Sequence, residues 1–192
     1  MKISLKYISS AIVSLVVLFY TLRFVGISIL PDITGTISET SQTVRDVEKG
    51  VLLGRQAPLF DLPDARGGRV KSSQYIGVSG VVVMFWATWN KESADQVKIF
   101  DDYLTHHAGD RTPVQLIAVN SQEDASVASS FIRRGSYAVP FALDTYGDVS
   151  QSFKIKSLPT TYFVGRDGNV QEIYVGLLSE GMIVDKIEQI LK

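Results

Sequence analysis

Few side chains in this sequence are suited to catalysis, because it contains no cysteine and only two histidines. His106 and His107 are adjacent, and adjacent residues on a helix point in different directions, so we expect a solvated helix end and not a copper or zinc site. Asn90 and Ser93 stand at the predicted start of the same helix, where either one would need a base within hydrogen-bonding reach to act as a nucleophile. Both histidines lie at the other end of that helix. We therefore expect no catalytic residue, no metal and no other cofactor.

The composition excludes several functional classes. Without cysteine, the chain alone can form no disulfide, no thiolate nucleophile, no cysteine-ligated zinc site and no iron–sulfur cluster. The formal net charge is -1, and no basic run is present that could neutralise nucleic-acid phosphates. With 192 residues and no internal repeat, the sequence predicts one globular domain with a short appendage.

The appendage is predicted to be an N-terminal membrane anchor over residues 1–30. Residues 7–30 are uncharged except for Arg23, and a helix rising ~1.5 Å per residue over this length can cross a hydrocarbon core of ~30 Å. Lys2 and Lys6 precede the apolar run, so the positive-inside rule puts the N-terminus in the cytoplasm and the domain outside the bacterial cytoplasmic membrane.

Two questions about this segment stay open. Arg23 either reaches the outer membrane interface, which we favour, or meets an acidic residue of a partner helix. The segment is either an uncleaved anchor, which we favour, or a cleaved signal peptide, although no clear cleavage site follows it. Residues 31–56 are rich in Ser, Thr and Gly and predict a stalk with a short helix around residues 38–49.

Residues 57–192 are predicted to form an α/β domain in which strands and helices alternate. The predicted strands cover residues 68–71, 80–86, 114–120, 141–144, 160–166 and 169–176. Helices are predicted from Asn90 toward Gly109, after Ser121, and over residues 148–153 and 179–191. Asp167 and Gly168 form a hairpin signal, so the two strands that they join should be antiparallel.

Two of the predicted helices have recognisable starting residues. Asn90 is a good N-cap, and apolar residues follow it at helical spacing. Ser121 is predicted to cap the next helix, which should bury one side carrying Val127, Phe131 and Ile132.

Three segments carry a resemblance to a known family: APLFDLPDARGGRV at 57–70, VVVMFWATWNKES at 81–93 and SLPTTYFVGRDGNV at 157–170. Together they resemble the membrane-anchored thioredoxin-like thiol-disulfide oxidoreductases of the TlpA/ResA type, several of which serve cytochrome c maturation. The resemblance covers about residues 54–192 and includes the α-β insertion of this type at 123–153. It implies a thioredoxin-like fold, with a mixed central sheet and helices on both faces, and an anchored domain outside the membrane.

The same resemblance identifies what this chain lacks. The family signature is W-C-x-x-C, and after Trp89 this sequence has Asn90 and Ser93 at the two cysteine positions. Gln96 stands where many cytochrome-maturation members have a carboxylate. Because disulfide exchange requires a thiolate, an amide and a hydroxyl cannot perform it, and we expect a redox-inactive domain.

A binding groove is nevertheless expected beside the former catalytic site. Leu158, Pro159 and Thr160 match the family's cis-proline loop, whose backbone pairs in the family with an extended substrate segment and needs no sulfur to do so. The groove implied by the resemblance is formed by Trp89, Asn90, Ser93, Leu158, Pro159 and Thr160. Trp86 ends a buried strand and is expected in the core, whereas Trp89 is the expected exposed contact.

These observations predict a redox-inactive thioredoxin-like domain that binds another protein, as an assembly chaperone or as a structural subunit of a membrane complex. The alternative is thiol-disulfide exchange or cytochrome c maturation with thiols supplied by a partner. The expected partners are membrane or extracytoplasmic proteins, and no nucleic acid.

Overall fold

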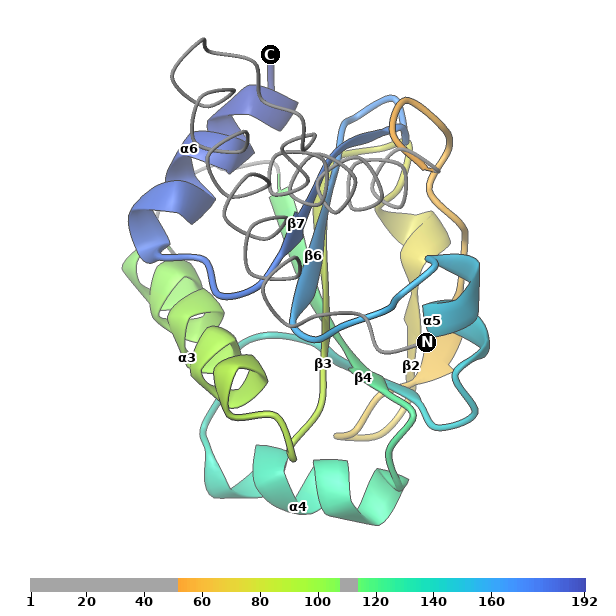
Figure 1. Cartoon of the computed structure of the whole chain (residues 1–192), viewed down its shortest axis with the longest axis vertical. Coiled ribbons are helices and arrows are strands. Elements are labelled where there is room, and N and C mark those ends of the chain that lie inside the picture. The colour runs from red at the N-terminus through yellow and green to blue at the C-terminus, as the bar shows by residue number, and fades with distance from the viewer. Residues whose placement is uncertain (1–51, 108–113) are drawn as a thin grey trace, which may run out of the picture. The chain divides into compact units, whose positions relative to one another are not determined.

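The computed structural model describes residues 52–107 and 114–192 of the chain (Figure 1). The predicted anchor over residues 1–30, with Arg23 in it, and the helix expected around residues 38–49 lie outside these residues. None of the helices in the two described stretches is both long enough and apolar enough to cross a membrane.

The described elements agree closely with the predicted order. They are β1 (Asp61–Pro63), β2 (Arg69–Lys71), the short helix η1 (Ser72–Gln74), β3 (Gly80–Trp86), α3 (Lys91–His106), β4 (Val114–Ser121), α4 (Ala125–Arg134), β5 (Phe141–Asp144), α5 (Asp148–Ser152), β6 (Thr160–Val164), β7 (Val170–Val175) and α6 (Glu180–Ile190). β1 and β2 form a separate hairpin, and the other strands form a five-stranded sheet in the order β5-β4-β3-β6-β7.

The sheet is mixed, as predicted. β3, β4 and β5 are parallel to one another, because α3 and α4 return the chain to the same edge of the sheet before each new strand. β6 is antiparallel to both β3 and β7, and the turn at Asp167 and Gly168 joins β6 to β7 as the hairpin signal indicated.

The centre of the sheet is covered on both faces, which explains why all seven residues of β3 are buried. Val82, Met84 and Trp86 face the core that contains residues of α3 and α6. Val81, Val83 and Phe85 face the other core, to which Val70 of β2 and Phe153 at the end of α5 also belong. Figure 1 shows α3 and α6 on one side of the sheet and the β1–β2 hairpin with α5 on the other.

The helix after β4 begins later than predicted. Ser121 is not its cap, because this residue continues β4 and pairs with Asp144 of β5. Asp124 caps α4 instead, and its Oδ1 accepts a hydrogen bond from the Ser126 backbone N–H at 2.7 Å. Hydrogen bonds from Ser126 also hold the pKa of the Asp124 carboxyl below its ordinary value.

The later start of α4 changes which residues face the core. Val127 was predicted to be buried but is 48% exposed, whereas Ala128 and Ile132 are buried. Phe131 is partly buried and packs on the same core. Ala128 and Ile132 are four residues apart and therefore share one face of the helix, so this pair defines the face turned to the sheet.

The folded part begins before the expected boundary at Ala57. Leu53 bridges to Val170 at the start of β7, and Gln56 bridges to Asn169. The Gln56 amide strengthens the second bridge by donating to the Asn169 Oδ1 at 2.8 Å. Residues assigned to the stalk thus cover part of the outer edge of the sheet.

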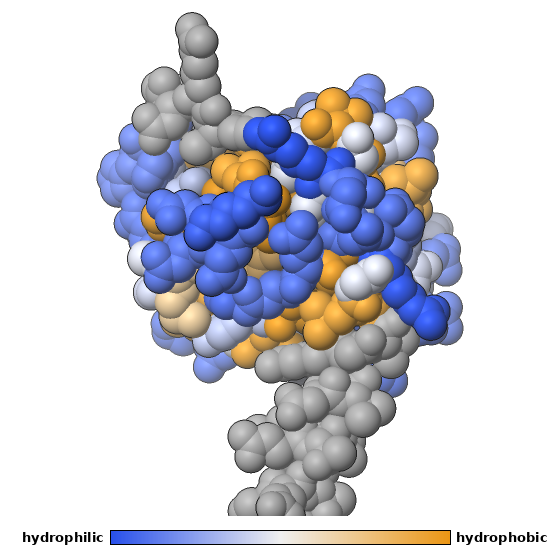
Figure 2. All heavy atoms as spheres, turned by 90° about the horizontal axis from the view of Figure 1, so that it is seen from above, coloured by the Kyte–Doolittle hydropathy of each residue, from blue (hydrophilic) through white to orange (hydrophobic). Residues whose placement is uncertain are grey.

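Some large apolar side chains remain exposed. On the face shown in Figure 2, hydrophobic residues form separate patches among hydrophilic ones. The exposed large hydrophobic residues of the described part are Leu53, Leu59, Val78, Trp89, Val127, Tyr146, Val175 and Leu177. Trp89 and Tyr146 are the two aromatic residues in this set, and they line the same groove.

Candidate functional site

The Asn90 side chain joins two segments that are far apart in the sequence. Its Oδ1 accepts the Ser93 backbone N–H at 2.8 Å, which caps α3 as predicted. Its Nδ2 donates to the Leu158 carbonyl oxygen at 3.2 Å. The acceptor end of one amide therefore completes the start of the helix, while the donor end holds the loop that precedes β6.

The residues expected to form the binding groove do not all reach the surface. Ser93, Pro159 and Thr160 are buried, whereas Asn90 and Leu158 are partly exposed. The Ser93 hydroxyl has no hydrogen-bond partner in the described part of the chain, and the Leu158–Pro159 peptide bond is cis. The accessible part of the expected groove consequently consists of Trp89, Leu158 and the edge of Asn90.

The two tryptophans have different environments. Trp86 is fully buried, and its ring lies 5.2 Å from Phe131 and 5.5 Å from Phe141 between ring centroids. Trp89 is 70% exposed. Trp86 is therefore a core residue and Trp89 a surface residue, as expected.

Gln96 lies in the interior and not in the groove. It is fully buried, its Nε2 donates to the Leu178 carbonyl oxygen at 3.2 Å, and its Oε1 accepts the Leu178 N–H at 2.5 Å. This residue connects α3 to the segment between β7 and α6, so its contacts are structural.

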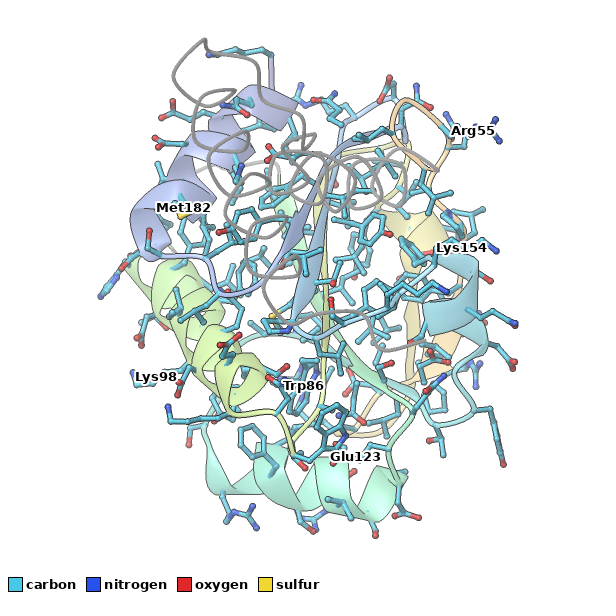
Figure 3. All side chains as sticks on the ribbon, in the orientation of Figure 1. Arg55, Trp86, Lys98, Glu123, Lys154 and Met182 are labelled. Carbon is cyan, nitrogen blue, oxygen red and sulfur yellow. The ribbon has the colours of Figure 1, made fainter. Side chains whose placement is uncertain are left out.

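Glu123 is a positioning residue that sequence reasoning missed. Its carboxylate accepts hydrogen bonds from the Thr88 backbone N–H at 3.0 Å, from the Thr88 hydroxyl, and from the Asn120 amide at 2.8 Å. Figure 3 shows Glu123 and Trp86 at the same end of the sheet. These contacts hold the segment that leads into Trp89 and Asn90. Asn120 is three residues from Glu123, but Thr88 is 35 residues away, and only the fold brings Thr88 and Glu123 together.

A groove of about 470 Å³ lies between the loop before β6, the start of α5 and the end of β4. Trp89 and Leu158 line it, together with residues that the sequence did not indicate, among them Tyr146, Gln122 and Ser150. Tyr146 is 90% exposed. In the sequence, a tyrosine before a glycine indicates only a turn. That Tyr146 shares a groove with Trp89 is known only from the fold.

Buried polar residues lie beneath this groove. The Asp144 carboxylate is 2% exposed and accepts hydrogen bonds from the backbone N–H groups of Val149 at 3.2 Å and Ser150 at 2.7 Å. It also accepts the Ser150 hydroxyl at 2.7 Å, and that hydroxyl lies 2.6 Å from the Ser121 hydroxyl. The first free N–H groups of α5 are thus already bound by a carboxylate of the same chain.

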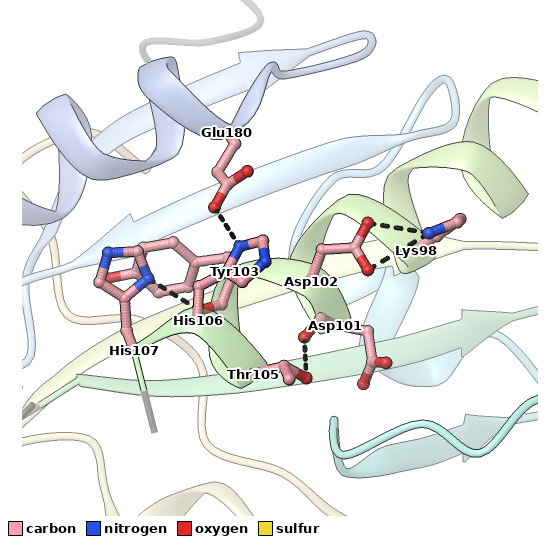
Figure 4. Close-up of polar contacts among 8 residues, drawn as sticks. All are labelled: Lys98, Asp101, Asp102, Tyr103, Thr105, His106, His107 and Glu180. Carbon is pink, nitrogen blue, oxygen red and sulfur yellow. Dashed lines mark hydrogen bonds and ion pairs between the residues drawn. The ribbon is translucent and has the colours of Figure 1, made fainter. Parts of the chain in front are cut away.

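Among the described residues, no three or more His, Asp or Glu side chains lie together so that they could hold a metal ion. His106 Nδ1 lies 2.9 Å from Glu180 Oε1, and the His107 ring stacks on Tyr103 at 4.3 Å between centroids. Both histidines are therefore engaged in contacts at the end of α3 (Figure 4).

Comparison with known proteins agrees with the fold. The model of the AhpC/TSA family matches residues 53–173. The chain is 30% identical over 132 residues to the thiol-disulfide oxidoreductase ResA of Bacillus subtilis, covering 69% of this chain and 72% of that protein. It is also 28% identical over 140 residues to ResA of Geobacillus kaustophilus, covering 73% and 79% of the two chains.

Solved structures give the same result. A crystal structure of a putative thiol:disulfide interchange protein DsbE from Chlorobium tepidum matches with a TM-score of 0.62 and 26% identity, covering 70% of this chain and 97% of that one. StoA from Bacillus subtilis matches in fold, with a TM-score of 0.59, 18% identity and coverage of 68% and 96%. The chain therefore belongs to the AhpC/TSA family and has a ResA-like thioredoxin fold, with cysteine at no position of its sequence.

Proposed function

We propose that this protein is a redox-inactive thioredoxin-like module that binds another protein. The observation that carries the proposal is the double engagement of Asn90, which caps α3 and bonds the Leu158 carbonyl. In a thiol oxidoreductase, the N–H groups at such a helix start stabilise a thiolate. Here the neutral amide of Asn90 accepts one of these groups, the Ser93 N–H, in a structural contact.

The surface around Asn90 supports a binding role. Trp89 is 70% exposed, and Leu158 is partly exposed beside it in the groove. The Gly176 N–H donates to the Pro159 carbonyl at 2.9 Å, which brings the end of β7, with exposed Val175, and the following residue Leu177, also exposed, to the same loop. Large apolar side chains gathered in this way are typical of a surface that a protein partner covers.

Membrane attachment is part of the same proposal. The apolar run over residues 7–30 and the lysines before it support a single-pass anchor with the folded domain outside the bacterial cytoplasmic membrane. A tethered domain needs only modest affinity for a neighbouring membrane protein, because confinement raises the effective concentration of both. The role is that of an assembly chaperone or a subunit of a membrane complex.

The redox part of the proposal is tested by reduction of insulin with dithiothreitol as electron donor. The full chain in detergent should give no acceleration over the blank, and the double variant Asn90→Cys, Ser93→Cys should give a clear one, because the scaffold then carries a dithiol at a helix start. The single variant Asn90→Cys is the matched control, since it cannot close an internal disulfide. Turnover by the natural chain would overturn the proposal.

The binding part is tested by isolating the full chain from its native membrane in mild detergent and measuring the mass of the complex. A stoichiometric complex is expected, and Trp89→Ala should dissociate it. Val78→Ala is the control, because Val78 is 72% exposed but lies at the opposite end of β3. A monomer, or a complex indifferent to Trp89→Ala, would count against binding at this surface.

A further inference from the structure

We infer that the end of the domain at which the chain enters the fold is a membrane-contacting surface. Its exposed apolar side chains meet the interface of the bilayer, and two arginines meet the phosphates of anionic lipid headgroups. The surface consists of Leu53, Arg55, Val78 and Arg166 and is called the chain-entry surface below. This inference rests on the membrane attachment included in the proposed function, and it names the face of the domain that turns to the bilayer.

The chain-entry surface forms where three segments meet at Gly168, in the turn between β6 and β7. A Cβ on Gly168 would lie 2.7 Å from the Gln56 side-chain oxygen and 3.5 Å from the Gly77 backbone nitrogen. Arg55 and Val78 are the residues next to these two neighbours. Both therefore lie beside the turn, and Figure 2 views the domain from this end, where hydrophobic patches lie among hydrophilic residues.

Apolar and cationic side chains are combined on this surface. Leu53 is 42% and Val78 is 72% exposed, so both can move from water into the interface of a bilayer. Arg55 and Arg166 are also exposed, and within the described residues neither guanidinium forms a hydrogen bond or an ion pair. Apolar side chains next to cations are typical of surfaces that attach to anionic membranes.

Nearby carboxylates only partly offset the two arginines. Asp167 accepts the Asn169 backbone N–H at 3.0 Å and the Asn169 amide at 2.6 Å, and these bonds hold the pKa of its carboxyl below the ordinary value. Its negative charge therefore persists and opposes one arginine. At the C-terminus, which Figure 1 shows at the same end, the Lys192 side chain offsets the terminal carboxylate. A net positive charge remains beside Leu53 and Val78.

The course of the chain favours a membrane over a protein as the occupant of this surface. The described part begins at Leu52, so residues 31–51, which connect the predicted anchor to the domain, join it at the chain-entry surface. At ~3.3 Å per residue these residues reach at most about 70 Å. A tether keeps its own point of attachment closest to the anchor, so weak contacts are enough to dock this end of the domain on the bilayer.

Docking in this way turns the surface around Trp89 away from the bilayer. Val78 precedes β3 and Trp89 follows it, and the seven residues of this strand span about 23 Å. Figure 3 shows Arg55 at one end of the sheet and Glu123 at the other. The partner is therefore met through a part that stands clear of the membrane.

The test uses the absence of cysteine from the natural chain, which makes any introduced thiol a unique labelling site. Val78→Cys and Val127→Cys are labelled with the same fluorophore. Val127 is 48% exposed on α4, which follows the carboxyl end of β4 and thus lies at the opposite end of the sheet from Val78. The Val127→Cys chain is therefore the control for any attraction of the fluorophore itself to lipid.

Each labelled full chain is reconstituted into vesicles of equal parts phosphatidylcholine and phosphatidylglycerol and, in parallel, of phosphatidylcholine alone. Lipids with a nitroxide near the headgroup quench a fluorophore that touches the bilayer. In the vesicles with phosphatidylglycerol, the label at position 78 should be quenched and the label at position 127 should not. Raised salt should weaken the quenching.

The arginines are tested in the Val78→Cys chain. Arg55→Gln together with Arg166→Gln should lower the ratio of docked to undocked domain by about 30-fold, because each cation near an anionic surface contributes a factor of about 5. Arg133→Gln with Arg134→Gln removes the same charge from the exposed side of α4 and should leave quenching unchanged. All four arginines are exposed, so both double variants should keep the melting temperature of the natural chain.

Other results overturn the inference in distinguishable ways. If the chain stays with the vesicles through an alkaline wash but the two labels are quenched equally or not at all, anchoring stands and the chain-entry surface is wrong. Equal quenching in phosphatidylcholine alone, or quenching that withstands the Arg55 and Arg166 substitutions, would remove the anionic headgroup. Loss of the native complex in that double variant would assign the surface to a protein. A chain that the alkaline wash releases would contradict the anchor of the proposed function itself.

Discussion

Gln96 and Leu178 exchange two hydrogen bonds inside the protein, one in each direction. The amide of Gln96 is the donor to the Leu178 carbonyl and the acceptor for its N–H, with both residues fully buried. An ionised carboxylate at this position could accept the N–H but would face the carbonyl oxygen without a proton to share. Glutamine satisfies both backbone groups at every pH, which suits a fixed connection between α3 and the segment before α6.

The first prediction follows from this contact. Gln96→Glu should destabilise the fold at neutral pH, because burial beside the Leu178 carbonyl raises the pKa of the new carboxyl above its unfolded value of about 4.3. The folded state then binds the proton more tightly than the unfolded state. The free energy of unfolding of the variant, compared with that of the natural chain, should therefore be highest below about pH 4.3. It should fall as pH rises toward the pKa of the new carboxyl in the folded state. Thermal unfolding at several pH values measures this, and a pH-independent difference would contradict it.

A second prediction concerns Asn90 and separates its two hydrogen bonds. Asn90→Ala loses the cap and the bond to Leu158 and should lower the free energy of unfolding by about 1 to 3 kcal/mol. Asn90→Ser keeps a capping oxygen but is too short to reach the Leu158 carbonyl, so it should recover about 1 kcal/mol. Urea unfolding of both variants measures the two contributions. Equal stability of the Ala and Ser variants would show that the cap contributes little.

A third prediction compares two buried serines. Ser93→Ala should be neutral or stabilising by up to about 1 kcal/mol, because the Ser93 hydroxyl has no partner in the described part of the chain. Ser150→Ala should destabilise by about 1 to 3 kcal/mol, because its hydroxyl bonds both Asp144 and Ser121. Both variants remove a hydroxyl oxygen from a buried serine. A melting temperature that falls for Ser150→Ala but not for Ser93→Ala would therefore support the assigned hydrogen bonds, and an equal fall in both would contradict them.

Glu123 supports a fourth prediction. Glu123→Gln replaces one acceptor oxygen by an NH₂ group that faces the donors of Thr88 and Asn120, and it should cost about 1 to 3 kcal/mol. Amide exchange at Thr88 should accelerate, because its N–H loses a charged acceptor. Glu188→Gln on the exposed face of α6 is the matched control and should change neither quantity. Unchanged exchange at Thr88 would contradict the assigned contact.

The fifth prediction concerns pH and the end of α3. A hydrogen bond to Glu180, together with the charge of that carboxylate and of Asp102, raises the pKa of His106 above its ordinary value of 6.5. The contribution of the His106–Glu180 pair (Figure 4) is therefore fully present below about pH 6.5 and lost as pH rises through the raised pKa.

The measurement is the melting temperature of the full chain between about pH 5 and pH 9, compared with His106→Gln and Glu180→Gln. Both variants should remove the same part of the pH dependence. The effect should be small and weakened by salt, because the pair is exposed. If His106→Gln leaves the pH profile unchanged, the ion pair does not form in solution.

The sequence by itself determined those parts of the structure whose causes lie within a few neighbouring residues. The apolar run of β3, the cap at Asn90 and the hairpin signal at Asp167 and Gly168 each have their cause within a few residues, and the structure agrees with all three. The cap of the helix after β4 was misassigned, because Ser121 and Asp124 are both suitable caps. Pairing of Ser121 with Asp144 in the neighbouring strand decided between them.

The tertiary structure alone decided which residues share a site. Glu123 meets Thr88, Gln96 meets Leu178, and Tyr146 lines one groove with Trp89, although each pair is widely separated in sequence. It also buried Ser93, Pro159 and Thr160, three of the residues that the family resemblance implied for the groove. A sequence pattern records the type and spacing of residues, whereas exposure and contact depend on how strands and helices pack together, and that information resides in no single segment.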